Sequence, residues 1–127
     1  MVWYLDTSAF LKLVVEEDES TAMMQWFESH SSVWSSQLLR TEALRAAARL
    51  AIPVHLVEEA LDAVALILPT EETFAKAGRL QPVGLRSLDA IHLASALELG
   101  ADLEGLVSYD DRLIDAAGGA SVAVVSP

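Results

Sequence analysis

Four acidic side chains stand in sequence contexts that could bring their carboxylates together: Asp6, Glu42, Asp89 and Asp110. Asp6 directly follows the apolar, β-prone run Val2–Leu5, and Asp110 follows a second such run at residues 106–108. In an open parallel sheet, ligands bind outside the carboxyl ends of the strands. If both runs are central parallel strands, both carboxylates therefore emerge at the same edge of the sheet.

The other two acids lie on expected helices. Asp89 falls in the first turn of a helix that Ser87 is expected to cap, and its apolar and small neighbours indicate a buried surface. Glu42 lies in a helix rich in Ala and Leu over residues 37–50. Each acid also has a simpler interpretation, as a helix N-cap, a partner of the helix dipole or, for Glu42 with Arg45, a surface ion pair. These simpler interpretations do not require the order and local context of the four acids to agree, so their agreement favours a common site.

Four converging carboxylates would require cations. Two carboxylates ~4 Å apart repel each other by ~4 kcal/mol at an effective dielectric near 20. Oxygen-only ligands select hard ions such as Mg²⁺ or Mn²⁺. One or two such ions could hold a phosphodiester, activate a water and stabilise the leaving oxygen. The acids therefore predict metal-dependent phosphodiester hydrolysis.

The elements that must position the acids follow from apolar periodicity and capping signals. Helices are expected over residues 7–16, 20–29, 37–50, 53–67, 71–80, 87–99 and 110–117, and strands over residues 2–5, 32–35, 106–108 and 122–125. Residues 66–68 fit either the end of the fourth helix or a short strand. Pro53 is expected at the first helical position, Gly100 to end a helix, and residues 118–119 to form a turn. This alternation predicts an α/β fold with a central parallel β-sheet flanked by α-helices, in one domain over residues 1–127.

The composition narrows the class of protein. A chain of 127 residues fits one domain, and the absence of cysteine excludes disulfides, thiolate zinc sites and cysteine nucleophiles. The hydrophobic fraction of 53% and the mean hydropathy of +0.36 are high, but no apolar run approaches the ~20 residues of a membrane span. The apolar N-terminus lacks a basic segment, so it does not resemble a signal peptide. We therefore expect a cytoplasmic protein with no membrane association, whose apolar excess indicates a buried interface with a second copy or a partner.

The net charge of −11 bears on possible partners. Such a surface repels nucleic acid at long range, which counts against a simple nucleic-acid binder. A metal-dependent nuclease is less affected, because the metal carries positive charge into the site. A protein partner with a basic or amphipathic segment is favoured, because opposite potentials speed and orient association.

The acidic segments, taken in order, resemble the motifs of the PIN-domain family, and within it the VapC toxins of bacterial toxin–antitoxin pairs. The matching segments are Asp6-Thr7-Ser8-Ala9, Glu42 with Arg45, Ser87-Leu88-Asp89-Ala90-Ile91-His92-Leu93-Ala94 and Ser108-Tyr109-Asp110-Asp111-Arg112-Leu113. The third segment is the most specific. In the fourth, Ser108 stands where the family usually has Thr, which keeps the hydroxyl. Asp111 is an ambiguous neighbour, and the register of the motif favours Asp110.

The resemblance implies a PIN fold and an Mg²⁺- or Mn²⁺-dependent endoribonuclease that acts on RNA. It implies a homodimer and a VapB-like antitoxin partner. It also implies that the metal and catalytic site consists of Asp6, Glu42, Asp89 and Asp110. Ser8 and Ser108 would supply hydroxyls that orient carboxylates or water.

Several cationic side chains could reach a substrate phosphate. Lys12 shares a helical face with Ser8, while Arg45 and Arg49 share a face with Glu42. The alternative for each is a surface ion pair of little energetic value. The two interpretations are weighed evenly for Arg45, and the ion pair is favoured for Arg49.

Other polar and aromatic candidates have simpler interpretations. His92 could be a metal ligand or a general base, but a packed histidine is favoured. Trp26, Phe27 and Trp34 could stack on bases, but they are not interleaved with basic residues, so core or interface packing is favoured.

Other classes of protein share an acidic α/β architecture. A phospho-accepting receiver domain carries paired acids after its first strand and a Lys after its fifth, whereas here a single Asp6 follows the first strand and no Lys follows Lys76. A haloacid-dehalogenase-type phosphatase would need a second Asp two residues after Asp6. A PIN-like interaction module without catalysis remains the main alternative, and the presence of all four acids argues against it.

Overall fold

The computed structural model describes all 127 residues and contains a five-stranded, entirely parallel sheet. The strands are β1 (Val2–Leu5), β2 (Val33–Ser36), β3 (Ala65–Ile67), β4 (Leu103–Val107) and β5 (Val124–Val125). They lie in the order β3-β2-β1-β4-β5, so β1 is central. The chain moves outward from β1 through β2 to β3 and then crosses to β4 on the other side. The sheet therefore has a topological switch point at β1.

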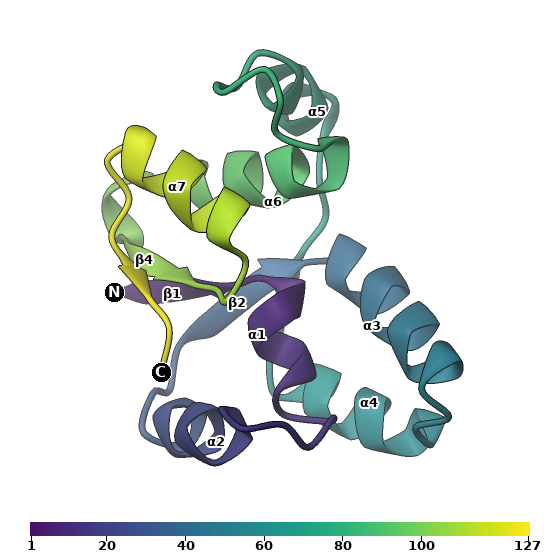
Figure 1. Ribbon diagram of the computed structural model, residues 1–127. Helices are drawn as coiled ribbons and strands as arrows, with labels where there is room; N and C mark the ends of the chain where they lie inside the picture. Colours follow the sequence, from purple (N-terminus) through teal and green to yellow (C-terminus); the bar gives the residue numbers. More distant parts are fainter.

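Seven α-helices surround this sheet, six of them on its two faces (Figure 1). They are α1 (Thr7–Leu11), α2 (Ser20–Glu28), α3 (Leu38–Arg49), α4 (Val54–Asp62), α5 (Glu71–Gly78), α6 (Ser87–Leu97) and α7 (Asp111–Gly119), and a short 3₁₀ helix spans Gly100–Asp102. Helices α1 to α4 lie on one side of the sheet, α6 and α7 lie on the other, and α5 packs outside α6. None of these helices has the length and apolar character that a membrane crossing requires.

The alternation of side chains along β1 divides the core in two. Leu5 points to one face and packs with Phe10 and Met23 in a cluster that α1 to α4 complete. Tyr4 points to the opposite face, where it packs with Leu93 of α6 and other residues of α6 and α7. Leu5 and Tyr4 are both fully buried. The central strand is therefore fixed from both sides, and so is the position of the residue that follows it.

The predicted fold class is confirmed, with corrections at several boundaries. The first helix ends at Leu11 instead of Glu16, because the following segment folds back as a loop. In that loop Ser20 Oγ donates to the Val15 carbonyl and accepts from the Glu17 amide. These side-chain bonds replace the backbone bonds that a longer helix would make.

Other boundaries also differ from the sequence predictions. The undecided segment at residues 66–68 overlaps strand β3, whose backbone pairs with β2. Pro53 is the N-cap of α4 and not its first helical residue, and Arg86, not Ser87, is the N-cap of α6. Residues 118–119 are the last helical residues of α7, and the expected turn lies just beyond them. Glycine is compatible with the last turn of a helix as well as with the residue after it. The glycine pair at residues 118–119 therefore did not indicate where α7 ends.

Candidate active site

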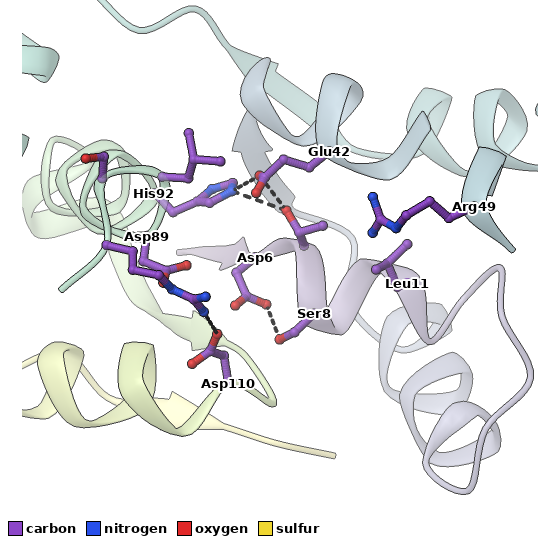
Figure 2. Close-up of a pocket in the computed structure, with 12 residues that line it drawn as sticks. Asp6, Ser8, Leu11, Glu42, Arg49, Asp89, His92 and Asp110 are labelled. Carbon is purple, nitrogen blue, oxygen red and sulfur yellow. Dashed lines mark hydrogen bonds and ion pairs between the residues drawn. The ribbon is translucent and has the colours of Figure 1, made fainter. Parts of the chain in front are cut away.

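A cavity of about 590 Å³ opens at the carboxyl ends of the strands, and all four predicted acids line it (Figure 2). Asp6 comes from the end of β1, Glu42 from α3, Asp89 from the first turn of α6 and Asp110 from the segment between β4 and α7. Ser8 also lines the cavity. The inference that the ends of β1 and β4 bring Asp6 and Asp110 to one edge of the sheet thus agrees with the geometry.

Asp6 is both a helix cap and a buried acid. One carboxylate oxygen accepts from the Ala9 amide at 3.0 Å and from the Ser8 hydroxyl at 2.7 Å. The other oxygen accepts from the Ser108 hydroxyl at 2.7 Å. Burial raises the pKa of this carboxyl above its ordinary value, although these three hydrogen bonds and the nearby His92 act in the opposite direction. Ser8 and Ser108 therefore donate to the two oxygens of the Asp6 carboxylate.

Glu42 is held by hydrogen bonds and does not pair with Arg45. Its Oε1 atom accepts from the Thr7 hydroxyl at 2.7 Å and lies 2.6 Å from His92 Nε2. Burial opposes ionisation of Glu42, but the hydrogen bond and charge of His92 together with the hydrogen bond from Thr7 outweigh it, so the pKa is lowered. Glu42 is therefore an ionised acid at neutral pH, fixed on one of its two oxygens.

Asp89 and Asp110 share a cation that the sequence did not single out. Arg86 places Nε 3.6 Å from Asp89 Oδ2 and Nη2 3.9 Å from Asp110 Oδ2. Burial raises the pKa of Asp89, the charges of Asp110 and Glu42 raise it further, and Arg86 and His92 oppose this. The sequence signal that could have identified Arg86 is its position three residues before Asp89 at the start of a helix, a spacing at which side chains of opposite charge can pair.

Asp110 is also the N-cap of α7. Its Oδ1 atom accepts from the amides of Arg112 and Leu113 at 2.9 and 3.2 Å, while its other oxygen lies nearer Arg86. The neighbouring Asp111 is exposed and is not among the residues that line the cavity. The structure therefore distinguishes the two adjacent acids in favour of Asp110.

The cationic candidates are distributed differently from the sequence predictions. Lys12 does not line the cavity and instead contacts Glu17 at 3.2 Å and Glu19 at 3.0 Å. Arg45 is exposed and lies outside the cavity, whereas Arg49, one helical turn further along α3, lines it. The sequence favoured Arg45 over Arg49 as a phosphate contact, whereas the structure places Arg49 at the cavity and Arg45 outside it. Which of the two arginines lines the cavity depends on the turn of α3 that α1 approaches, and helix periodicity alone does not specify that turn.

The aromatic candidates pack against the protein. Trp26 makes an edge-to-face contact with Trp3 at 5.5 Å and stacks on His30 at 4.0 Å. Phe27 packs against the larger core cluster, and none of Trp26, Phe27 and Trp34 lines the acidic cavity. These placements agree with the packing interpretation.

The chemistry of the donors fits a hard divalent ion, but their arrangement does not yet form a closed site. The donors are carboxylate oxygens. Burial and then repulsion from Asp110 and Glu42 raise the pKa of Asp89, and a bound cation relieves such repulsion. No group of three or more His, Asp or Glu side chains is placed to hold one metal ion in this structure. Metal binding would therefore require the acids to draw together, with Arg86 moving away from Asp89 and Asp110.

The fold and the cavity together define a class: a doubly wound α/β protein with an oxygen-donor acidic pocket at the switch point of a parallel sheet. The family model of the PIN domain matches residues 3–119. The chain belongs to the PIN-domain family. A receiver domain and a dehalogenase-type phosphatase are thereby excluded.

Relatives match almost the full length of the chain. Ribonuclease VapC46 of Mycobacterium tuberculosis is 41% identical over 125 residues, which cover 98% of this chain and 96% of the relative. Ribonuclease VapC47 of the same species is 35% identical over 130 residues, with the same coverage of both chains. Ribonuclease VapC35, also from this species, is 39% identical over 134 residues.

Solved structures share the fold at lower sequence identity. The crystal structure of M. tuberculosis VapC20, described as a toxin that cleaves the sarcin–ricin loop, superposes with a TM-score of 0.78 at 16% identity and covers 98% of this chain and 99% of its own. PAE2754 from Pyrobaculum aerophilum superposes with a TM-score of 0.67 at 20% identity, covering 98% of this chain and 83% of its own. These likenesses support the fold independently of the family match.

Proposed function

We propose that this chain is a VapC-type endoribonuclease, with residues 1–127 forming one nuclease domain and the acidic cavity as its active site. Three ribonuclease relatives match it over 98% of its length. The observation that carries the proposal is that Asp6, Glu42, Asp89 and Asp110, which are up to 104 residues apart in the sequence, line one cavity. A structural explanation for any one acid does not account for all four.

The four carboxylates would hold Mg²⁺ or Mn²⁺. When bound, such an ion would neutralise the acids, bind a phosphodiester oxygen and promote ionisation of a water molecule. Ser8 and Ser108 orient Asp6 toward the cavity through their hydroxyls. The protein supplies orientation, and the pocket supplies the negative potential that attracts the ion.

The RNA backbone would be received by the cationic side chains of the cavity. Arg49 and Arg86 line it alongside the four acids. The net charge of −11 repels RNA elsewhere on the surface, so these two guanidinium groups would carry much of the favourable phosphate contact. Arg86 is well placed for this exchange, because its side chain is 66% exposed and its contacts with Asp89 and Asp110 are long.

The antitoxin partner would be a small VapB-like protein with a basic or amphipathic segment. Arg86 already shows that a guanidinium can approach Asp89 and Asp110 together. An Arg or Lys side chain of the partner could insert between the same two carboxylates and displace the metal or the substrate. A synthetic partner segment should inhibit cleavage, and full inhibition by the same segment without its basic residues would contradict this mode.

A homodimer would bury the apolar surface around α5 and α6. Phe74 and Val83 are 53% and 89% exposed, and both line an apolar cavity of about 390 Å³ between these elements. A patch that lacks charge can be self-complementary across a two-fold axis, so a second copy is the occupant it favours. Light scattering should give a dimer mass that Val83→Glu converts to a monomer mass, whereas a monomer for the wild type would contradict this arrangement.

The central test is cleavage of a mixed RNA pool by the purified protein with Mg²⁺ or Mn²⁺ against EDTA. Cleavage should require the metal and should be lost in Asp6→Ala and Asp89→Ala. Asp110→Asn and Asp111→Asn form a matched pair, because only Asp110 lines the cavity. Activity should be lost in the first and retained in the second.

A second measurement separates a nuclease with a narrow substrate from an interaction module. A ligand at a hundredfold its Kd stabilises a protein by ~2.7 kcal/mol, so saturating Mn²⁺ should raise the melting temperature. Absence of both cleavage and this thermal shift would contradict the nuclease proposal and favour a module without catalysis.

A further inference from the structure

His92 connects the centre of the sheet with one of the four acids. The residue belongs to α6 and is 1% exposed. Its Nδ1 atom lies 2.8 Å from the hydroxyl of Tyr4 on β1, and its Nε2 atom lies 2.6 Å from Oε1 of Glu42 on α3. The close-up shows the ring pointing at Glu42 across the upper part of the pocket (Figure 2).

The chemistry of the two partners determines which ring nitrogen carries the proton. A carboxylate only accepts hydrogen bonds, so the proton between His92 and Glu42 lies on Nε2. The hydroxyl of Tyr4 is buried, and burial raises its pKa, so it stays protonated beside Nδ1. The arrangement therefore places a proton on Nε2 and directs it at Glu42.

A second donor reaches the same oxygen of Glu42. The hydroxyl of Thr7 donates to Oε1 at 2.7 Å, and Thr7 follows Asp6 directly in the chain. Hydrogen bonds to an ionised acceptor are among the stronger ones in proteins. With Oε1 taken by two donors, Oε2 is the oxygen that remains for the cavity.

We infer that His92 is the positioning residue of Glu42, and that Tyr4 acts behind it by holding the ring in the orientation in which Nε2 donates to Glu42. The inference rests on the proposed function, in which Glu42 is a metal ligand. Both ring nitrogens of His92 are engaged, so neither is free to bind a metal or to accept a proton from water. Partners of this kind orient metal ligands, and their loss typically weakens metal binding about 10- to 100-fold.

The test uses Tyr4→Phe, which removes one buried hydroxyl and keeps the ring. Tyr109→Phe is the matched control, because the hydroxyl of Tyr109 has no hydrogen-bond partner. The readouts are the affinity for Mn²⁺, from electron paramagnetic resonance of the free ion, and the melting temperature in EDTA. Tyr4→Phe should weaken Mn²⁺ binding by about 3- to 10-fold, the scale of one hydrogen bond, and Tyr109→Phe should leave it unchanged.

Variants of His92 separate positioning from packing. His92→Gln places an amide donor near the position of Nε2 and should retain most of the Mn²⁺ affinity. His92→Leu keeps an apolar side chain in the core but no donor, and it should weaken Mn²⁺ binding by about 10- to 100-fold. If His92 acts in packing alone, the Mn²⁺ affinities of the two variants should follow their melting temperatures and not their ability to donate a hydrogen bond to Glu42.

A double-mutant cycle tests whether Tyr4 acts through His92. In the His92→Leu background, Tyr4→Phe should cause no further loss of Mn²⁺ affinity, because the intermediate group is already gone. A Tyr4→Phe effect of undiminished size in that background would overturn the relay. So would wild-type affinity in a folded His92→Leu variant.

The outcomes also distinguish this inference from the function on which it rests. If the wild type binds Mn²⁺ and cleaves RNA but Tyr4→Phe matches Tyr109→Phe in affinity, only the positioning role fails. If the wild type binds no Mn²⁺ and cleaves no RNA, the nuclease proposal fails and takes this inference with it. In RNA cleavage, the supporting result at saturating metal is a lower kcat with an unchanged KM.

Discussion

Replacing Asp6 by Asn is expected to stabilise the metal-free protein near neutral pH. Asp6 is 3% exposed, and burial raises the pKa of its carboxyl. An acid whose pKa is raised by folding stabilises the protein fully below its unfolded pKa, and this contribution is lost as the pH rises through the folded pKa. At higher pH the folded protein must either bury the charge or take up a proton, and both cost free energy. Asn removes this cost.

The size of the effect follows from the surroundings of Asp6. Burying one charge costs several kcal/mol, and each hydrogen bond to a charged group returns roughly 1.5 kcal/mol. Three donors, from Ala9, Ser8 and Ser108, return about 4–5 kcal/mol, and against a burial cost of about 6 kcal/mol the net penalty is about 1–2 kcal/mol. Asn keeps an acceptor for Ala9 and Ser8, and the hydroxyl of Ser108 can turn to accept from its amide. For a domain of this size the expected rise in Tm is about 4–8 °C.

The assay is thermal unfolding followed by circular dichroism in EDTA from pH 4.5 to 8. The difference between Asp6→Asn and the wild type should be small at the acid end and should widen as the pH rises. Saturating Mn²⁺ should reverse the order, because only the wild type keeps all four acids. Asp111→Asn controls for the loss of one charge. An Asp6→Asn variant that is less stable at every pH, or a difference independent of pH, would refute the reasoning.

Three other substitutions test separate parts of the structure. Arg86→Ala should raise the KM for RNA several-fold and reduce the slope of log affinity against log salt by about 0.7, one phosphate contact, when cleavage is titrated with KCl. Ser108→Ala leaves one oxygen of Asp6 without its donor and should lower stability in urea by about 1–3 kcal/mol, while Ser108→Thr should restore it. Gly105→Ala would place a Cβ 2.6 Å from the Trp3 ring and 2.8 Å from the Ala123 carbonyl oxygen, so urea unfolding should show a loss of about 1–3 kcal/mol.

The sequence located the acids well because strand ends and helix starts are local signals. It treated helix capping and metal binding as competing roles, whereas the geometry allows both for one side chain. Asp110 caps α7 with Oδ1 while its other oxygen lies near Arg86. Asp6 caps α1 and lines the cavity. The commonest structural role of an Asp after a strand is therefore also what fixes its carboxylate at the pocket.

The parts that the sequence did not predict depend on contacts between distant segments. Glu42 and His92 are 50 residues apart and meet only because α3 and α6 lie on opposite faces and converge at the same sheet edge. Arg86 enters the pocket because the chain turns into α6 at that residue. The preference for Arg45 over Arg49 failed for the same reason. Periodicity identifies which face of a helix is buried. The turn of the helix that a neighbouring element contacts depends on the tertiary packing.

The metal-free pocket is tolerated because the protein's own donors and cation distribute its negative charge. Asp6 receives three donors and Glu42 receives two, while Asp89 and Asp110 share Arg86. These contacts also hold the carboxylates in separate positions, which explains why no three of them form a ready metal site. In the proposed site a metal would therefore compete with Arg86, and an RNA phosphate that attracts Arg86 would help the metal to bind. Metal and RNA should accordingly bind with positive cooperativity, which Mn²⁺ affinity measured with and without a non-cleavable RNA would show as an increase that Arg86→Ala removes.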